Sequence, residues 1–198
     1  MVTKSLGMFI SSLSSPLNNF NSLYLILTVF FFLFNSSELI IGEEKVDPGI
    51  VFIFEGAVKD RIYPSSFHLP ESQTDVHIEA RVNWDNEKIP EGAVPGGFIP
   101  YVHITALVKN SKTGLKTFVD LKPHINLIDN FHYARNIALP GPISDLYNVQ
   151  FKVSAPSNTE LALHNDWLKE YGKNFLSEYT FNYKGINFKQ IAEATRDK

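Results

Sequence analysis

The sequence predicts an all-β domain, an antiparallel β-sandwich, from three observations. After Gly42 the chain divides into short segments separated by Pro, Gly and Asn. In several of these segments apolar and polar residues alternate with a period of two, which is the period of a half-buried strand. Six or more such segments follow one another, and no long helical pattern competes with them. Many short strands with turn signals between them are typical of a sandwich.

The expected strands follow in chain order. They comprise residues 49–58, 75–84, 100–109, 115–121, 146–154 and 177–184. The second strand alternates most clearly, with Val76 and Ile78 on one face and His77 and Glu79 on the other. A polar turn, NSKTG, joins the third strand to the fourth. The helical candidate near residues 165–171 is too short to change the fold class.

The start of the chain has the pattern of a targeting region. Residues 23–34 are apolar throughout, and twelve residues span roughly 18 Å as a helix, less than the roughly 30 Å hydrocarbon core of a bilayer. Asn35, Ser36 and Ser37 follow, and they suit signal-peptidase cleavage. We expect residues 1–42 to be a signal peptide, or alternatively an uncleaved anchor, and residues 43–198 to be an exported domain.

The composition excludes several functional classes. The formal net charge is −3 and the basic residues are scattered, so no nucleic-acid-binding surface is expected. The chain contains no cysteine, and its two methionines are Met1 and Met8. A metal in the domain must therefore be held by histidines and carboxylates, which suit copper, zinc or iron.

The histidines are the candidate metal ligands. His77 and Glu79 share a strand face by period, and His103 lies on the matching face of another expected strand. His132 lies in the polar, turn-prone stretch 129–133. If the two strands are neighbours and that stretch folds across them, these side chains form a site for Cu(II), Zn(II) or Fe(II). The alternative is a set of unrelated surface histidines, which is how we interpret two further ones in polar loops, His68 and His164.

Several ordered segments resemble one protein family. Residues 75–80, Asp-Val-His-Ile-Glu-Ala, are similar to the Asp-Ile-His-Leu-Glu-Ala segment of the periplasmic iron-transport accessory proteins, which accompany an iron permease of the bacterial inner membrane. Residues 99–102, the turn 108–114, and the stretch from Pro123 through His132-Tyr133-Ala134 to Ile137 also resemble that family in order, as do residues 147–156. The resemblance runs loosely over residues 49–185.

The resemblance implies a dimeric, immunoglobulin-like sandwich with a metal site near the subunit interface. The implied ions are copper(II) and iron, with zinc possible in vitro, and the implied partners are a second copy and an inner-membrane iron permease. His77, Glu79 and His132 match the family's ligands, and His103 matches less closely. The family's methionine ligand has no match, because the expected domain contains no methionine; the loop 92–98, where that ligand is expected, carries Pro-Gly-Gly. His124 lies near a place where the family has an apolar or Met residue, and it is a candidate replacement.

Three functions compete on this basis. The first is a periplasmic metal-binding accessory to iron or copper uptake without turnover of its own. The second is a structural or interaction sandwich of the same fold that has lost the metal. An enzyme is not expected, since the sequence has neither a Gly-x-Ser-x-Gly elbow nor a His-Glu-x-x-His motif.

Overall fold

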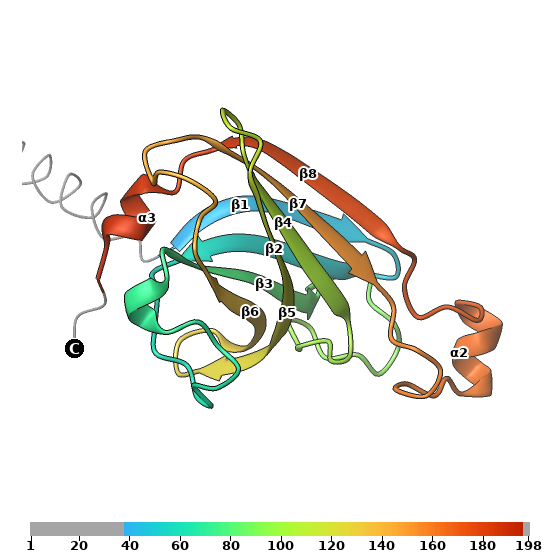
Figure 1. Cartoon of the computed structure of the whole chain (residues 1–198). Helices are drawn as coiled ribbons and strands as arrows, with labels where there is room; N and C mark the ends of the chain where they lie inside the picture. Colours follow the sequence, from blue (N-terminus) through green and yellow to red (C-terminus); the bar gives the residue numbers. More distant parts are fainter. Residues whose placement is uncertain (1–37, 196–198) are drawn as a thin grey trace, which may run out of the picture. The chain divides into compact units, whose positions relative to one another are not determined.

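The structure, a computed structural model, describes residues 38–195, which form an all-β domain (Figure 1). Its strands are β1 (Glu38–Val46), β2 (Ile50–Ala57), β3 (Val76–Trp84), β4 (His103–Asn110), β5 (Lys116–Asn126), β6 (Asn130–Ile137), β7 (Tyr147–Ser154) and β8 (Tyr179–Ile186). The short helical segments are η1 (Glu71–Gln73), α2 (Asn165–Glu170) and α3 (Lys189–Glu193). Within this described part, no helix is long and apolar enough to span a bilayer.

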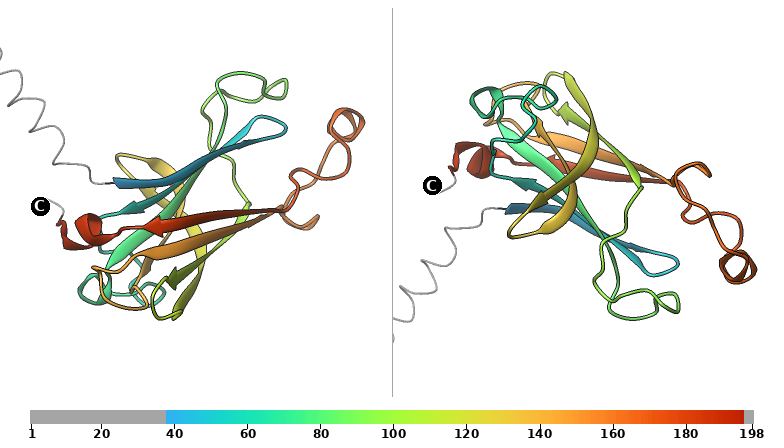
Figure 2. Two further views of the ribbon diagram at one scale, coloured as in Figure 1. Left: turned by 90° about the horizontal axis from the view of Figure 1, so that it is seen from above. Right: turned by 90° about the horizontal axis from the view of Figure 1, so that it is seen from below.

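The eight strands form one antiparallel sheet in the order β1-β2-β3-β6-β5-β4-β7-β8. Strand β5 joins its two halves, because residues 116–121 pair with β4 and residues 122–126 pair with β6. The sheet curls strongly, so that its edge strands approach each other (Figure 2). Tyr183 of β8 donates a hydrogen bond of 2.8 Å to Glu44 of β1 across this gap. The prediction of an all-β, antiparallel fold is confirmed.

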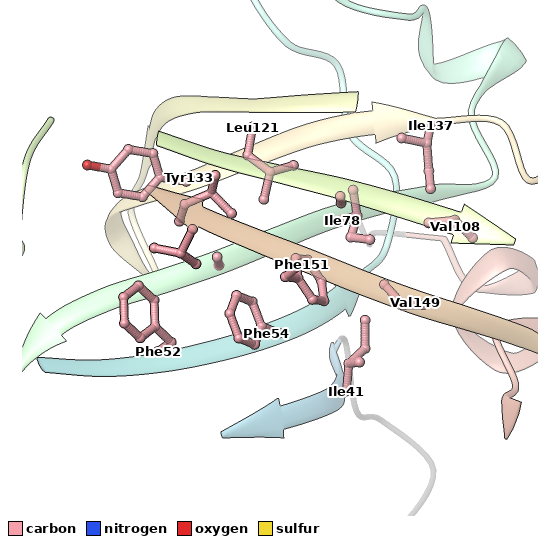
Figure 3. Packing of buried hydrophobic residues seen from close by; sticks show 14 of the residues in the cluster. Ile41, Phe52, Phe54, Ile78, Val108, Leu121, Tyr133, Ile137, Val149 and Phe151 are labelled. Atoms are coloured by element: carbon pink, nitrogen blue, oxygen red, sulfur yellow. The ribbon is translucent and has the colours of Figure 1, made fainter. Parts of the chain in front are cut away.

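The core lies inside the curl, where the inward residues of both halves meet (Figure 3). The rings of Phe54 on β2 and Phe151 on β7 stack with their centres 4.1 Å apart. Each buried side chain of this size contributes roughly 1.5–3 kcal/mol by leaving water. Tyr133 of β6 is also buried there. Its hydroxyl donates to the carbonyl of Ile99 at 2.9 Å and accepts from the N–H of Val102 at 3.1 Å, which fixes the segment before β4.

Two strands lie outside the expected set. Strand β1 begins at Glu38, so residues 38–42, which we expected in the leader, are part of the sheet. The remainder of the expected leader, residues 1–37, lies outside the described residues. Strand β6 carries His132, and the expectation that this histidine lies in a loop is wrong. The turn precedes it, between Asn126 and Asn130.

The outer face of β3 is also buried, although its alternation predicts a non-core face. The loop between β2 and β3 (residues 58–75, the β2–β3 loop) is tied to β6, because the Asn136 amide donates to the carbonyls of Asp60 at 2.8 Å and Leu69 at 3.0 Å (Figure 1). On this outer face, His77 and Glu79 are only 3% and 1% exposed. Polar groups buried in this way need partners, and they mark a candidate site.

Candidate metal centre

Strand register brings the histidines together on the outer face of β3, β6 and β5. His77 lies directly opposite Asn136 in the β3–β6 ladder, and His124 lies directly opposite His132 in the β5–β6 ladder. Residues opposite each other in an antiparallel ladder project from the same face. Ala134 lies between the two β6 positions, and its small side chain leaves room on this face.

His77, His124 and His132 form the histidine trio. Each offers a ring nitrogen, and these three nitrogens lie within 4.8 Å of one another. The ring centres are 5.3 Å apart for His77 and His124, 5.8 Å for His124 and His132, and 6.2 Å for His77 and His132. Ligand atoms bound at about 2 Å to one ion lie within roughly 4 Å of one another, so a small contraction places all three on a single ion.

The hydrogen bonds of two rings determine which nitrogen faces the site. The Asn136 amide nitrogen donates to two carbonyls, so its Oδ1 is the acceptor of the 2.8 Å bond with His77 Nδ1. His132 Nδ1 lies 3.1 Å from the carbonyl oxygen of Asn130, and it must likewise be the donor. Both rings in their neutral form therefore carry the proton on Nδ1, which makes Nε2 the unprotonated nitrogen. Metal-binding histidines are commonly oriented in this way.

Glu79 faces the same nitrogens. Its Oε2 is 3.8 Å from His77 Nε2 and 3.6 Å from His132 Nε2. It also belongs to an acidic trio, in which carboxylate oxygens of Glu38, Glu79 and Asp129 lie within 4.8 Å of one another. Burial raises the pKa of Glu79 to about 8, with smaller contributions from nearby carboxylates, of which Glu55 is the largest. The positive charge of Arg81 lowers the pKa of Glu79 only slightly, and its guanidinium is bound to Glu55 at 2.6 Å.

His124 completes the fit to a cation. Its Nε2 is buried and has no hydrogen-bond partner among residues 38–195. Burial first, and then the neighbouring His77, lower the pKa of His124 to about 3, so the ring is neutral at physiological pH. A neutral imidazole whose buried nitrogen makes no hydrogen bond is suited to bind a metal ion. The residues present therefore fit a transition metal.

The structure brings together only part of the expected site. His77, Glu79 and His132 converge, and His124, the candidate replacement for methionine, lies with them. His103 belongs to neither trio of the described residues, and its exposed ring lies 2.9 Å from Glu160. Hydrogen bonds from His103 first, and then from Ser157, lower the pKa of Glu160 to about 2.

Other acidic and histidine residues had no sequence signal of their own. Glu38 falls in the expected leader, and Asp129 falls in the expected turn. His68, expected at the surface, is half-buried with its ring centre 5.0 Å from that of His124. His164 is exposed, as expected, at the start of α2.

Several known proteins are similar to this chain in fold, in sequence or in both. A copper-bound variant of Campylobacter jejuni P19 is 26% identical with a TM-score of 0.63, over 75% of this chain and 96% of P19. FetP of uropathogenic Escherichia coli shares the fold at 23% identity and a TM-score of 0.62, over 76% of this chain and 96% of FetP. The 34 kDa membrane antigen of Treponema pallidum is 29% identical over 108 residues, which are 54% of this chain and 52% of the antigen, so the chain spans about half of that relative. The profile of the family described as Fe2+ transport protein matches residues 35–187, and the chain therefore belongs to this family.

Proposed function

We propose that this protein is an exported accessory protein of iron uptake that holds a divalent transition metal and has no turnover of its own. The observation that carries the proposal is the histidine trio, whose ligand nitrogens lie within 4.8 Å of one another beside Glu79. Membership of the Fe2+ transport family and the copper-bound structures of P19 support it.

Copper(II) is the ion that suits the histidine trio. Imidazole nitrogens with a neighbouring carboxylate are ligands that copper(II), zinc and iron all accept, and divalent copper binds such sets most tightly. The chain has no cysteine and no methionine beyond Met8, so residues 38–195 offer no soft sulfur ligand for copper(I). We therefore expect copper(II) to bind most tightly, and zinc to bind less tightly in vitro.

The acidic trio adds a second set of ligands to the same centre, and these carboxylate oxygens are harder ligands than the imidazoles. Glu79 is common to both groups, and Glu38 and Asp129 approach it from β1 and from the β5–β6 turn. Carboxylate oxygens favour harder ions than imidazoles do. Iron bound at the acidic trio would replace the proton that Glu79 otherwise holds. The two sets of ligands can thus hold copper and iron side by side, with Glu79 between them.

The setting of this function is part of the proposal. FetP was produced in the periplasm, which supports export of the present chain to the same compartment. We also propose that the curled sheet is an immunoglobulin-like sandwich, that two copies form a homodimer with the metal near its interface, and that an inner-membrane iron permease is the partner. The family resemblance of residues 75–80 and the passage of β5 between the two halves of the sheet support these points.

Calorimetric titration with Cu(II), Zn(II) and Fe(II) tests the metal site. We expect one tight Cu(II) site per chain in the wild type. His77→Ala and His132→Ala each remove a ligand and should weaken Cu(II) binding more than about hundredfold, since loss of an outer-sphere partner alone costs about 10–100-fold. Asp129→Asn should weaken Fe(II) more than Cu(II).

Two further variants serve as controls. His164→Ala removes an exposed imidazole, and His103→Ala removes one that pairs with Glu160. Both should bind Cu(II) as the wild type does. Equal Cu(II) affinity in the wild type and in His132→Ala would contradict the proposal, and the protein would then be a sandwich without this metal site.

A further inference from the structure

His68 lies in the β2–β3 loop at a place where the loop is fixed against the metal centre. The next residue, Leu69, accepts a hydrogen bond of 3.0 Å from the Asn136 amide. The Thr74 hydroxyl donates to the carbonyl of Pro70 at 2.8 Å. The same Asn136 side chain accepts the Nδ1–H of His77. The loop position of His68 and the orientation of one member of the histidine trio are therefore set by one amide.

The ring of His68 lies at ligand spacing from one member of the trio, His124. Its centre is 5.0 Å from the centre of the His124 ring, and the two rings meet edge to face at 73°. The distances within the trio are 5.3, 5.8 and 6.2 Å. Imidazoles bound to one ion at about 2 Å hold their ring centres roughly 5–6 Å apart. The separation of His68 from His124 falls in this range.

The nitrogens of these two rings are also in an unusual state. His68 Nδ1 and His124 Nε2 are both buried, and neither has a hydrogen-bond partner among the described residues. A buried polar atom without a partner costs about 1–3 kcal/mol. One cation shared by the two rings would satisfy both nitrogens.

We propose that His68 is a fourth imidazole ligand, supplied by the β2–β3 loop to the ion held by His77, His124 and His132. This inference rests on the proposed function. In the structure His68 contacts His124 rather than all three rings, so ion binding draws the loop inward by a small step. The strands hold the three other ligands rigidly, whereas a loop ligand can adjust. Four nitrogens are a set that copper(II) favours, and they compensate for the absence of a thioether.

Pulsed electron paramagnetic resonance of the Cu(II)-loaded, full-length protein tests the proposal, because it counts the coordinated imidazoles. We expect four in the wild type and three in His68→Gln. The Cu(II) affinity of His68→Gln should fall about 10–100-fold, while its circular dichroism spectrum remains that of the wild type. His164→Gln is the matched control, since it removes an exposed imidazole and should keep four.

The possible failures are distinguishable. If His68→Gln keeps the nitrogen count of the wild type, whatever its affinity, His68 is not a ligand and the inference is overturned. In that case His132→Gln still loses tight Cu(II) binding, and the proposed function stands. If the wild type binds Cu(II) no better than His132→Gln does, both the proposed function and this inference are overturned.

Discussion

Glu79 is a buried carboxylic acid that faces the histidine trio, so its protonation depends on whether a cation is bound there. Its carboxyl group is 1% exposed, and burial together with nearby Glu55, Asp129 and Glu38 raises its pKa to about 8. At neutral pH the metal-free protein therefore keeps a proton on this side chain. A divalent ion at the centre supplies the positive charge that the site otherwise lacks, and its binding releases that proton.

This raised pKa makes metal-free stability fall as pH rises. Below about pH 4.5 the carboxyl group is protonated in both the folded and the unfolded chain, and between about pH 4.5 and 8 only the folded chain retains the proton. Folding is therefore increasingly disfavoured across this window. Glu79→Gln should remove the effect and raise the free energy of unfolding at pH 8 by about a few kcal/mol, since each pKa unit corresponds to about 1.4 kcal/mol.

Urea denaturation in the presence of a chelator measures the free energy of unfolding of the metal-free protein at each pH. The difference between Glu79→Gln and the wild type should be near zero at about pH 4.5 and should increase up to about pH 8. Glu87→Gln, an exposed carboxylate, is the control and should follow the wild-type profile. A difference that is independent of pH would show that Glu79 is ionised in the folded, metal-free protein.

At the scale of secondary structure, β6 is the element that organises the site. It pairs with β3 on one side and with β5 on the other, so it lies between the ligand-bearing strands. It also carries His132 and Asn136, and the latter joins the β2–β3 loop to His77. The pairing order of three strands, rather than any local motif, creates the centre.

This explains what the sequence could predict. The alternation in residues 75–84 was enough to predict β3 and to place His77 and Glu79 on one face. The sequence does not predict strand β6, because its polar start favours a turn and its alternation of polar and apolar residues breaks at Ala134 and Arg135. Strand β5 was expected to end at Leu121, before Pro123. It continues because beyond Leu121 it pairs only with β6, and a proline is tolerated where one side of a strand is unpaired.

The positions of His124 and His68 could not be derived from local pattern. His124 joins the trio because it pairs with His132, and His68 lies beside His124 because the β2–β3 loop is bound to Asn136 of β6. The contacts of His124 with His77 and with His68 join residues that lie far apart in the sequence. The role of Glu38 could not be predicted for a different reason. The apolar segment before it indicates a leader that continues to residue 42, whereas Glu38 begins strand β1.

Loss of the Asn136 amide should loosen this arrangement. Asn136→Ala removes the acceptor of the His77 Nδ1–H and the donor to two loop carbonyls. We expect the free energy of unfolding to fall by about 2 kcal/mol. Cu(II) affinity should fall about 10–100-fold, because His77 loses its orienting partner.

The matched control is Asn182→Ala on β8. Asn182 is exposed and accepts one hydrogen bond from Gln150. Its removal should change stability by less than about 0.5 kcal/mol and leave Cu(II) affinity unchanged. If Asn136→Ala binds Cu(II) like the control, the amide does not position the ligand.

For the whole molecule, the exposed apolar residues indicate where a second copy would bind. The turn between β5 and β6 carries Leu127 and Ile128, which are 105% and 80% exposed, although turns usually consist of polar residues and glycine. Ile125 and Phe131 on the flanking strands are exposed as well. This hairpin also carries members of both trios, so a partner that covers it would enclose the metal centre. An isologous dimer is the simplest way to cover such a surface.

Sedimentation equilibrium of the purified domain tests this assembly. We expect the wild type to be a dimer at micromolar concentration. The double variant Leu127→Asp, Ile128→Asp should be monomeric, because a dimer would have to bury two unpaired carboxylates from each copy. Val94→Asp, which changes an apolar residue that is 67% exposed in the loop after β3, should remain dimeric. The double variant should still bind Cu(II) in a monomer, since every histidine of the trio comes from one chain. A wild type that sediments only as a monomer would contradict the dimer and leave the metal site as a property of the single chain.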